Sequence, residues 1–390
     1  MDIRTKLVFA LVAASLGSML ALGAFAYGAA RDLLRDVALR QLEAVVDTKK
    51  ENLERAVVAW RDRVQLITSR TQLRESLETF RHSPDDETLE SIEESLQDAI
   101  ESVQSLRGIA VFSAFGKPVA SIGIVPGADA PVRPVTFMWA EEPVMYEDVF
   151  LDPAGTLLIT FISPIRLRGQ LLGAAKVALR ADELIDVTDD YTGLGETGET
   201  LIAQLDDDGN AVILNPLRHD PGASMIRRVS AEHTEDPTLQ AALGNEDTFE
   251  SGAVDYRGQE VWAATRFLEE FGWGLVVKVD TAEETRPVIE FRNTLAKLAL
   301  SLSAFAIVGG IGFGIYFARP IRELADVARR IRQGELDLRA KTGTDDEVGL
   351  LAETFNQMTE ELVRSNRTLE QQIRDGNRAG SATGGGGTGS

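Results

Sequence analysis

The chain has 390 residues, a formal net charge of −21 and no cysteine. Its length allows two or three domains, and the lack of cysteine excludes disulfide frameworks, thiolate nucleophiles and cysteine-ligated metals. Both ends of the chain are nearly neutral, so the excess acid lies in residues 31–297, which argues against partners such as nucleic acid or anionic lipid.

Two uncharged apolar runs are long enough to cross a membrane, residues 7–30 and residues 298–318. A run of 24 residues gives a helix of about 36 Å, more than the hydrocarbon core requires. The first run is longer than the core of most signal peptides. We therefore expect an uncleaved anchor, with cleavage after Ala24-Phe25-Ala26 as the alternative.

Short basic flanks predict the orientation of these two spans. Arg4 and Lys6 precede the first span, and Arg319 and Arg322 follow the second. Because basic residues favour the cytoplasmic side, we expect both termini, including residues 1–6, in the cytoplasm and residues 31–297 outside.

The outer region begins with a helical pattern and continues as two sheet-forming units. Residues 31–106 repeat apolar side chains at helical spacing between charges, which predicts stalk helices. Residues 108–123 and 155–180 each read as a hairpin, with turns at Phe115-Gly116-Lys117 and Arg168-Gly169. Residues from 181 are expected to form a helix that breaks at Gly193.

The second unit starts with "ETLIAQLDDDGNAVIL", a hairpin pattern with an Asp-Asp-Gly-Asn turn at residues 207–210. Residues 238–280 predict a short helix and three strands. The outer region is therefore divided into stalk helices at 31–106, a first α/β unit at 107–191 and a second at 192–290.

The stretches "TGLGETGETLIAQLDDDGNAVI" (192–213), "DYRGQEVWAATRFL" (255–268) and "GWGLVVKVDTAEE" (272–284) resemble the double Cache sensor domain. This resemblance implies two PAS-like folds on a long helix, with a small-molecule ligand in the first, membrane-distal unit. The spacing typical of amino-acid-binding members is absent. We expect Trp262 and Trp273 in the core, and the ligand-binding candidates are Arg133, Trp139, Tyr146, Asp148 and Asp182.

Residues 319–370, after the second span, predict a helix, an extended connector and a second helix. Ile321, Leu324 and Ile331 lie on one seam, which Gly334 ends. Asp345 or Asp346 can cap the second helix, whose seam is Val348, Leu351, Phe355, Met358 and Leu362. Such short seams are marginal alone, so we expect a homodimer that forms a four-helix bundle.

The order of Pro320, Gly334-Glu335-Leu336, Asp346-Glu347-Val348-Gly349 and Phe355-Asn356-Gln357-Met358 resembles a HAMP domain, the signal-converting module of bacterial membrane receptors. The resemblance implies an inner-membrane location and a relay of motion from the second span. Residues 371–390 are expected to be a Gly/Ser-rich tail or linker. The expected relay residues are Pro320, Ile321, Leu324, Ile331, Gly334, Glu347, Val348, Gly349, Leu351, Phe355 and Met358.

No arrangement of residues in the sequence points to catalysis, a metal or a cofactor. His82, His219 and His233 lack metal-ligand spacing. The G-x-G-x-x-G at residues 193–198 is not preceded by a strand pattern, so we interpret it as a connector rather than a dinucleotide fingerprint.

The predicted fold class is an α+β membrane protein with two transmembrane helices, two PAS-like units and a helical bundle. Its predicted function is a non-enzymatic receptor that relays ligand binding across the membrane. The alternative is the sensory part of a histidine kinase, cyclase or phosphatase whose catalytic domain lies outside this chain. A third hypothesis is a receptor that signals through a separate kinase or response protein.

Overall fold

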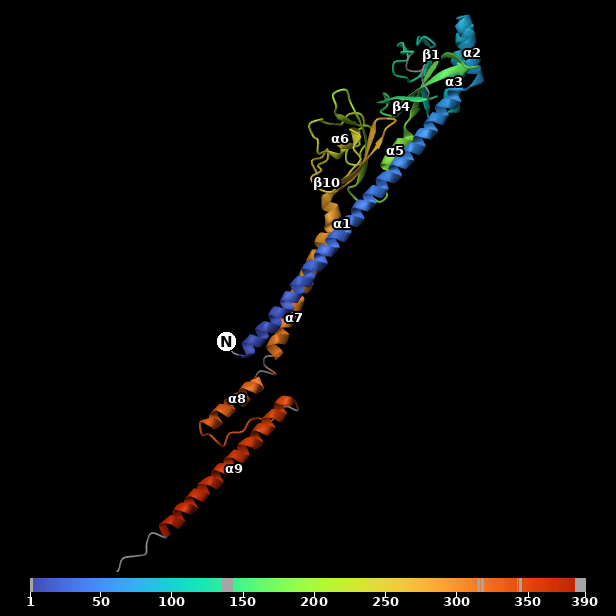
Figure 1. The fold of residues 1–390 in the computed structure, drawn as a ribbon. Helices are drawn as coiled ribbons and strands as arrows, with labels where there is room; N and C mark the ends of the chain where they lie inside the picture. The colour runs from blue at the N-terminus through green and yellow to red at the C-terminus, as the bar shows by residue number, and fades with distance from the viewer. Residues whose placement is uncertain are drawn as a thin grey trace, which may run out of the picture. The chain divides into compact units, whose positions relative to one another are not determined.

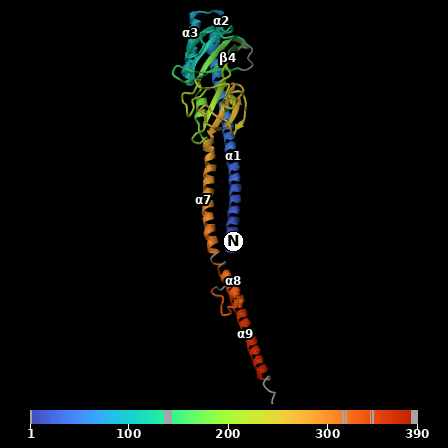
Figure 2. The same ribbon diagram turned by 90° about the vertical axis from the view of Figure 1, so that its left-hand side faces the viewer.

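The computed structural model describes residues 3–134, 143–313, 316, 319–341, 343 and 346–382. The chain divides into two compact units. We call Ala30–Ile289 the sheet unit, and we call Met1–Ala29 together with Glu290–Ser390 the helical unit. The mixture of helices and sheets agrees with the predicted fold class (Figure 1 and Figure 2).

Three helices form the first part of the sheet unit: the later part of α1 (Ile3–Thr68), then α2 (Thr71–His82) and α3 (Asp86–Ser102). Along α1, Leu42, Val46, Leu53 and Trp60 are buried at helical spacing, so one face of the helix enters the core. Asp85 begins α3 with a capping box, because its side chain accepts a hydrogen bond from the Thr88 amide at 2.9 Å. The predicted helical character of residues 31–106 is confirmed.

The first sheet is antiparallel, with the strand order β2-β1-β5-β4-β3. Its predicted hairpins at residues 108–123 and 155–180 are both present. Arg168 and Gly169 have positive φ angles of 49° and 82° at the second turn, as a tight hairpin requires. The strands are β1 (Leu106–Ser113), β2 (Pro118–Gly123), β3 (Met145–Leu151), β4 (Leu157–Leu167) and β5 (Gln170–Arg180).

Helix α5 (Asp182–Asp189) follows the first sheet and ends before Gly193, earlier than we expected. The reason is Asp190, whose side chain accepts hydrogen bonds from the Thr192 amide at 3.1 Å and the Thr192 hydroxyl at 2.6 Å. This local pairing competes with continued helix. The buried Lys49 of α1 also donates to the Val187 carbonyl at 2.7 Å and so satisfies a terminal carbonyl of α5.

The second sheet has the order β8-β7-β6-β11-β10-β9 and is also antiparallel. On β11, Trp273, Leu275, Val277 and Val279 join the main core with α1, while Gly274 lies on the opposite face beneath α6. The elements are β6 (Glu199–Leu205), β7 (Ala211–Ile213), β8 (Arg228–Val229), α6 (Pro237–Ala242), β9 (Thr248–Phe249), β10 (Val261–Leu268) and β11 (Trp273–Asp280).

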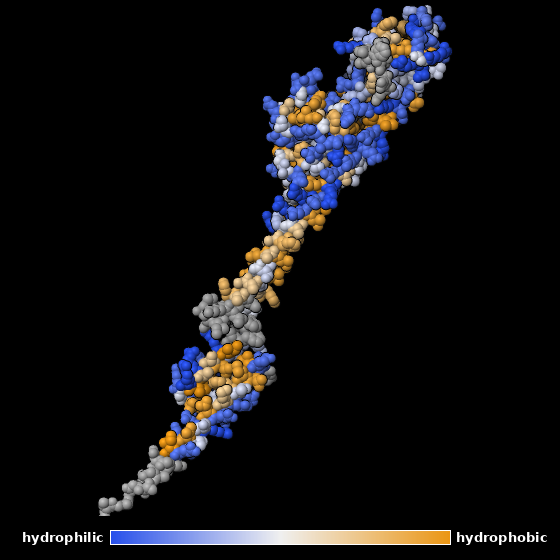
Figure 3. Space-filling model, viewed as in Figure 1, coloured by the Kyte–Doolittle hydropathy of each residue, from blue (hydrophilic) through white to orange (hydrophobic). Residues whose placement is uncertain are grey.

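The helical unit contains the start of α1, most of α7 (Thr281–Phe313), α8 (Arg319–Arg332) and α9 (Glu347–Ala382). Among the described residues, two helices are long and apolar enough to cross a membrane, Val12–Thr68 and Thr281–Gly312, and almost none of their most apolar stretch is buried. In Figure 3 the stretch where these two helices overlap is coloured mostly as hydrophobic. Helix α9 extends to Ala382, into the range expected as a tail.

The connector between α8 and α9 is fixed by two polar residues. Asp346 caps α9, because its side chain accepts hydrogen bonds from the amides of Val348 and Gly349, both at 3.1 Å. The Asn356 side chain bonds both backbone groups of Ala340 at 2.8 Å, so it pins the connector to α9. These contacts confirm the predicted helix, connector and helix.

We predict that Gly274→Ala destabilises the protein because α6 lies directly against this position. An added Cβ would be 2.3 Å from both the Ala241 carbonyl carbon and the Ala242 nitrogen, so the backbone of α6 would have to move. The expected loss is about 1–3 kcal/mol of unfolding free energy, measured by denaturant unfolding of the full chain in detergent. Gly222→Ala is the control, because beyond the adjacent residues the nearest atom to the added Cβ would be 3.8 Å away. Equal losses would contradict the prediction.

Candidate functional site

The outer face of the first sheet, the face turned away from α2, carries a buried cation. A Cβ on Gly173 would touch Leu77 of α2, so the alternate positions Ala174 and Lys176 point to the other face. The Lys176 ammonium pairs with both carboxylate oxygens of Glu147, at 3.0 and 2.9 Å. A largely buried charge beside apolar side chains can orient a charged solute.

Next to this ion pair, a polar contact and an irregular ladder join β4 to the edge strand β3. The buried Thr160 hydroxyl of β4 donates to the Asp148 carbonyl at 3.0 Å. The ladder between β3 and β4 is irregular between Tyr146 and Asp148, which sets Glu147 at a bulge. Bulges re-aim a side chain and recur beside functional sites, and here the bulged residue is the partner of Lys176.

The structure does not bring the five ligand-binding candidates together. Trp139 lies outside the described residues, and Arg133 and Asp148 are exposed. Asp182 opens α5, pairs with Arg180 at 2.7 Å and borders a separate cavity of about 360 Å³. Tyr146 points into a cluster of rings. Their roles in ligand binding stay predictions.

The two sheets meet through four aromatic rings, which we call the aromatic joint: Tyr146 and Phe161 from the first sheet, Phe271 and Trp273 from the second. The Tyr146 ring centroid lies 4.7 Å from that of Phe271 and 5.5 Å from that of Trp273. Phe161 approaches Phe271 edge-on at 6.4 Å. These separations fall in the favourable range for aromatic pairs, so the joint couples the sheets by close packing.

The aromatic joint also contains a small hydrogen-bonded triangle. The Trp273 indole N–H donates to the Tyr146 hydroxyl and to the Gln204 side-chain oxygen, both at 3.3 Å. The Tyr146 hydroxyl donates to the same Gln204 oxygen at 3.1 Å. Burial raises the pKa of Tyr146, so its hydroxyl keeps the proton that it donates. Satisfied polar groups of this kind fix one arrangement of a buried contact.

Helix α1 joins the same contact through Trp60. Its ring centroid lies 6.3 Å from that of Phe161, and its indole N–H donates to Glu183 of α5 at 2.8 Å. Arg63 of α1 reaches the same carboxylate at 2.6 Å. The long helix, α5 and both sheets therefore converge at the aromatic joint.

Beyond the joint, β11 passes a buried ionic cluster before it becomes α7. Lys278 pairs with the buried Asp255 and lies 4.0 Å from Glu199. Burial lowers the pKa of Lys278 against the opposing effect of these two acids. Burial alone would raise the pKa of Asp255, but Lys278 and Arg257 hold it below its usual range. Removing one partner of such a pair strands a buried charge.

The Gly193–Gly198 connector is clamped onto the first turn of α7. The Glu283 carboxylate accepts hydrogen bonds from the amides of Glu196 and Thr197, both at 2.8 Å. Gly195 has a φ of +63°, and a Cβ there would lie 2.3 Å from Glu283 Oε1. The glycines thus serve a close backbone approach, and the connector interpretation is confirmed.

The expected relay residues lie on α8, α9 and the connector between them. Ile321, Leu351 and Met358 are 50%, 53% and 58% exposed, although their spacing is that of a buried seam. Pro320, Leu324, Ile331, Val348 and Phe355 are half-buried, Gly334 and Glu347 are exposed, and Gly349 is buried. Figure 3 shows hydrophobic surface along this pair of helices. Their role as a relay stays a prediction.

Several important side chains were not predicted from the sequence. Lys176 had one signal, a lone cation within the apolar run "GAAKVAL". No signal in the sequence marks Gln204, Phe161 or Phe271, because their contacts form only where the two sheets meet. Among the described residues, no group of three or more His, Asp or Glu side chains is placed to hold a metal.

Two known protein families together match most of the chain. A family described as Cache domain matches residues 30–288, and HAMP domain matches residues 313–364. The methyl-accepting chemotaxis protein McpA of Pseudomonas putida is 25% identical over 221 residues, which cover 54% of this chain and 32% of McpA.

Two further similar proteins are sensors. The nitrate/nitrite sensor protein NarQ of Escherichia coli is 31% identical over 103 residues, which cover 23% of this chain and 18% of NarQ. The sensor domain of the Vibrio cholerae histidine kinase DctB has a TM-score of 0.45 and 12% identity, over 63% of this chain and 98% of that domain. The chain spans about a third or less of McpA and NarQ.

We predict energetic coupling between Tyr146 and Trp273. Tyr146→Phe and Trp273→Phe each remove one corner of the hydrogen-bonded triangle, so their effects on unfolding free energy should not add. A double-mutant cycle by denaturant unfolding should give a coupling of about 0.5–1.5 kcal/mol. The control cycle pairs Tyr146→Phe with Trp262→Phe, and coupling of the same size there would refute the special role of the triangle.

Proposed function

Because this chain belongs to the Cache domain family and carries a HAMP domain after its second span, we propose that it is a transmembrane receptor for a small extracytoplasmic solute. The solute binds the outer face of the first sheet, beside the Lys176–Glu147 ion pair. Binding changes the position of the second span, and the HAMP helices convert that motion into a cytoplasmic signal.

One observation carries this proposal: strand β3 contains both the solute-facing Glu147 and the joint residue Tyr146. A solute group that binds Lys176 in place of Glu147 would displace the Glu147 side chain and so shift β3. Tyr146 contacts Trp273, the first residue of β11. Strand β11 ends at Asp280, and α7 begins at Thr281. Solute face and membrane helix are therefore connected by contiguous packed elements.

The energetics of such a relay are modest. A solute shifts the receptor only by its difference in affinity for two states. Coupling energies are about 1–3 kcal/mol, and helix displacements of about 1–2 Å are sufficient to repack an interface. A satisfied, closely packed joint suits this task, because interfaces of this kind change between discrete arrangements rather than deforming continuously.

The proposed receptor is a homodimer. The exposed seam residues Ile321, Leu351 and Met358 would be covered by the same helices of a second copy in a four-helix bundle. In this proposal both termini are cytoplasmic in a bacterial inner membrane and residues 31–297 face outward. The downstream partner is a kinase or response protein, or a kinase domain continuous with this chain.

We expect that Lys176→Met abolishes solute-induced stabilisation. The test is thermal unfolding of the full chain in detergent against a panel of small carboxylates and zwitterions, where a ligand at 100 times its Kd stabilises by about 2.7 kcal/mol. Lys117→Met, at an exposed turn, is the matched control and should respond as the wild type does. A solute that stabilises the Lys176→Met protein equally would place its site elsewhere.

We expect Met358→Cys to give a disulfide-linked dimer on mild oxidation in membranes, because the seam would bring two copies of this position together. The wild-type chain has no cysteine, so one introduced thiol reports one position. Glu360→Cys lies two residues on, about 200° around the helix, and should cross-link far less. If both variants form dimer at the same rate, or neither does, the bundle is not formed by this seam.

A further inference from the structure

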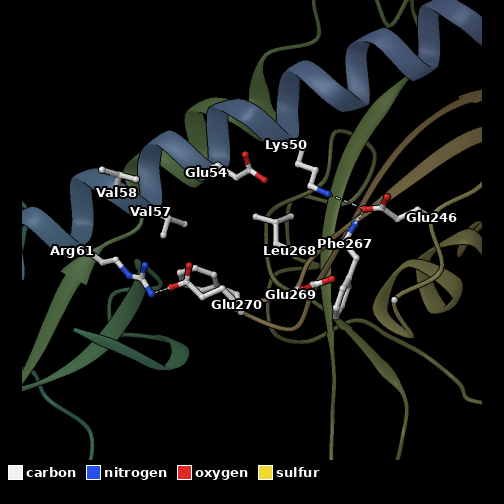
Figure 4. A pocket seen from close by; sticks show the side chains of 12 residues that line it. Lys50, Glu54, Val57, Val58, Arg61, Glu246, Phe267, Leu268, Glu269 and Glu270 are labelled. Carbon is white, nitrogen blue, oxygen red and sulfur yellow. Dashed lines mark hydrogen bonds and ion pairs between the residues drawn. The ribbon is translucent and has the colours of Figure 1, made fainter. Parts of the chain in front are cut away.

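A cavity of about 700 Å³ lies between α1 and the turn that joins β10 to β11, apart from the solute face of the first sheet. Its apolar floor is made by the buried residues Val57, Leu268 and Phe271. Figure 4 shows α1 along one side and the strand turn along the other. The volume is within the range of small-molecule sites, about 300–1,000 Å³.

An ion pair between α1 and the second sheet holds each end of the cavity. At one end Lys50 pairs with Glu246 at 2.8 Å, and the same Glu246 oxygen accepts the Phe267 amide at 2.9 Å. The hydrogen bond from Lys50 lowers the pKa of Glu246, so that carboxylate stays ionised. At the other end Arg61 pairs with Glu270. These contacts join α1 to the second sheet at both ends of the cavity and so hold its two walls apart.

Two carboxylates facing this space are not neutralised. Glu54 lies on the α1 wall and Glu269 on the opposite wall, and neither side chain has a hydrogen bond or ion pair with another described residue. Both lining cations are already paired with Glu246 and Glu270. The charge left uncompensated is therefore negative, on both sides of an apolar floor.

We propose that this cavity binds an organic cation with an apolar body, an alkyl- or arylammonium. Its apolar part would cover Val57, Leu268 and Phe271, and its ammonium would pair with Glu54 and Glu269. The ligand would touch Phe271 of the aromatic joint while it bridges α1 and the second sheet. It would thus act on the same joint as the solute of the first sheet, from a separate site.

The test uses 2-phenylethylammonium with the full chain in detergent, and isothermal titration calorimetry measures its Kd. We expect binding by the wild type and a loss of affinity of at least about tenfold in Glu54→Gln and in Glu269→Gln, since each removes one charge-assisted contact. Glu51→Gln changes an exposed acid on the same helix outside the cavity and should bind as the wild type does. The neutral 2-phenylethanol should bind at least about tenfold more weakly than the ammonium.

Lys176→Met separates this site from the solute face, because the protein without the Lys176–Glu147 ion pair should still bind 2-phenylethylammonium. Absence of binding to the wild type at millimolar concentration would overturn the proposal. Equal affinity in the Glu54→Gln, Glu269→Gln and wild-type proteins would overturn it too, as would equal affinity for the alcohol. Failure here would leave the receptor proposal intact, because that proposal rests on the first sheet.

Discussion

Burying the indole of Trp273 is the constraint on which the sheet unit depends. A buried indole N–H needs an acceptor, and the acceptors are Tyr146 from one sheet and Gln204 from the other. The indole N–H therefore makes both of these hydrogen bonds only when the two sheets are in place. The rings packed around this half-buried triangle shield it in part from water, and a lower local dielectric strengthens such bonds. A pair of PAS-like units is thus held as one body rather than as two domains on a linker.

The ionic cluster around Lys278 has a different role from the joint. Buried ion pairs add little net stability, because desolvation offsets the attraction between the charges. They do disfavour other pairing registers of the strand, because a shift of β11 by one residue would bring Lys278 into the apolar core beside α1. The cluster is therefore best understood as fixing the register of β11. Register matters here because the same strand carries Trp273 at one end and leads into α7 at the other.

Short-range pattern was enough to predict much of the fold. The hairpin at Arg168-Gly169 and the cap at Asp346 are both encoded within a few residues. The end of α5 was missed because it depends on a side-chain pairing of Asp190 with Thr192 and on Lys49, which is far away in sequence. The site was harder still. Tyr146 was selected as an aromatic beside a pocket, but its contacts come from Gln204 and Trp273 in the other sheet, and no periodicity encodes such a meeting.

The direct passage from Asp280 to Thr281 has a mechanical consequence. Strand β11 is hydrogen-bonded to β10 on one side and to β6 on the other, so it is among the least compliant elements of the sheet. No loop separates it from α7, and the Glu283 clamp removes slack from the first helical turn. Displacement entering this strand has no soft segment in which to dissipate. A displacement of β11 would therefore pass to α7 as a rotation, a tilt or a translation of that helix. The stiffness of the junction between Asp280 and Thr281 would determine which of these motions occurs.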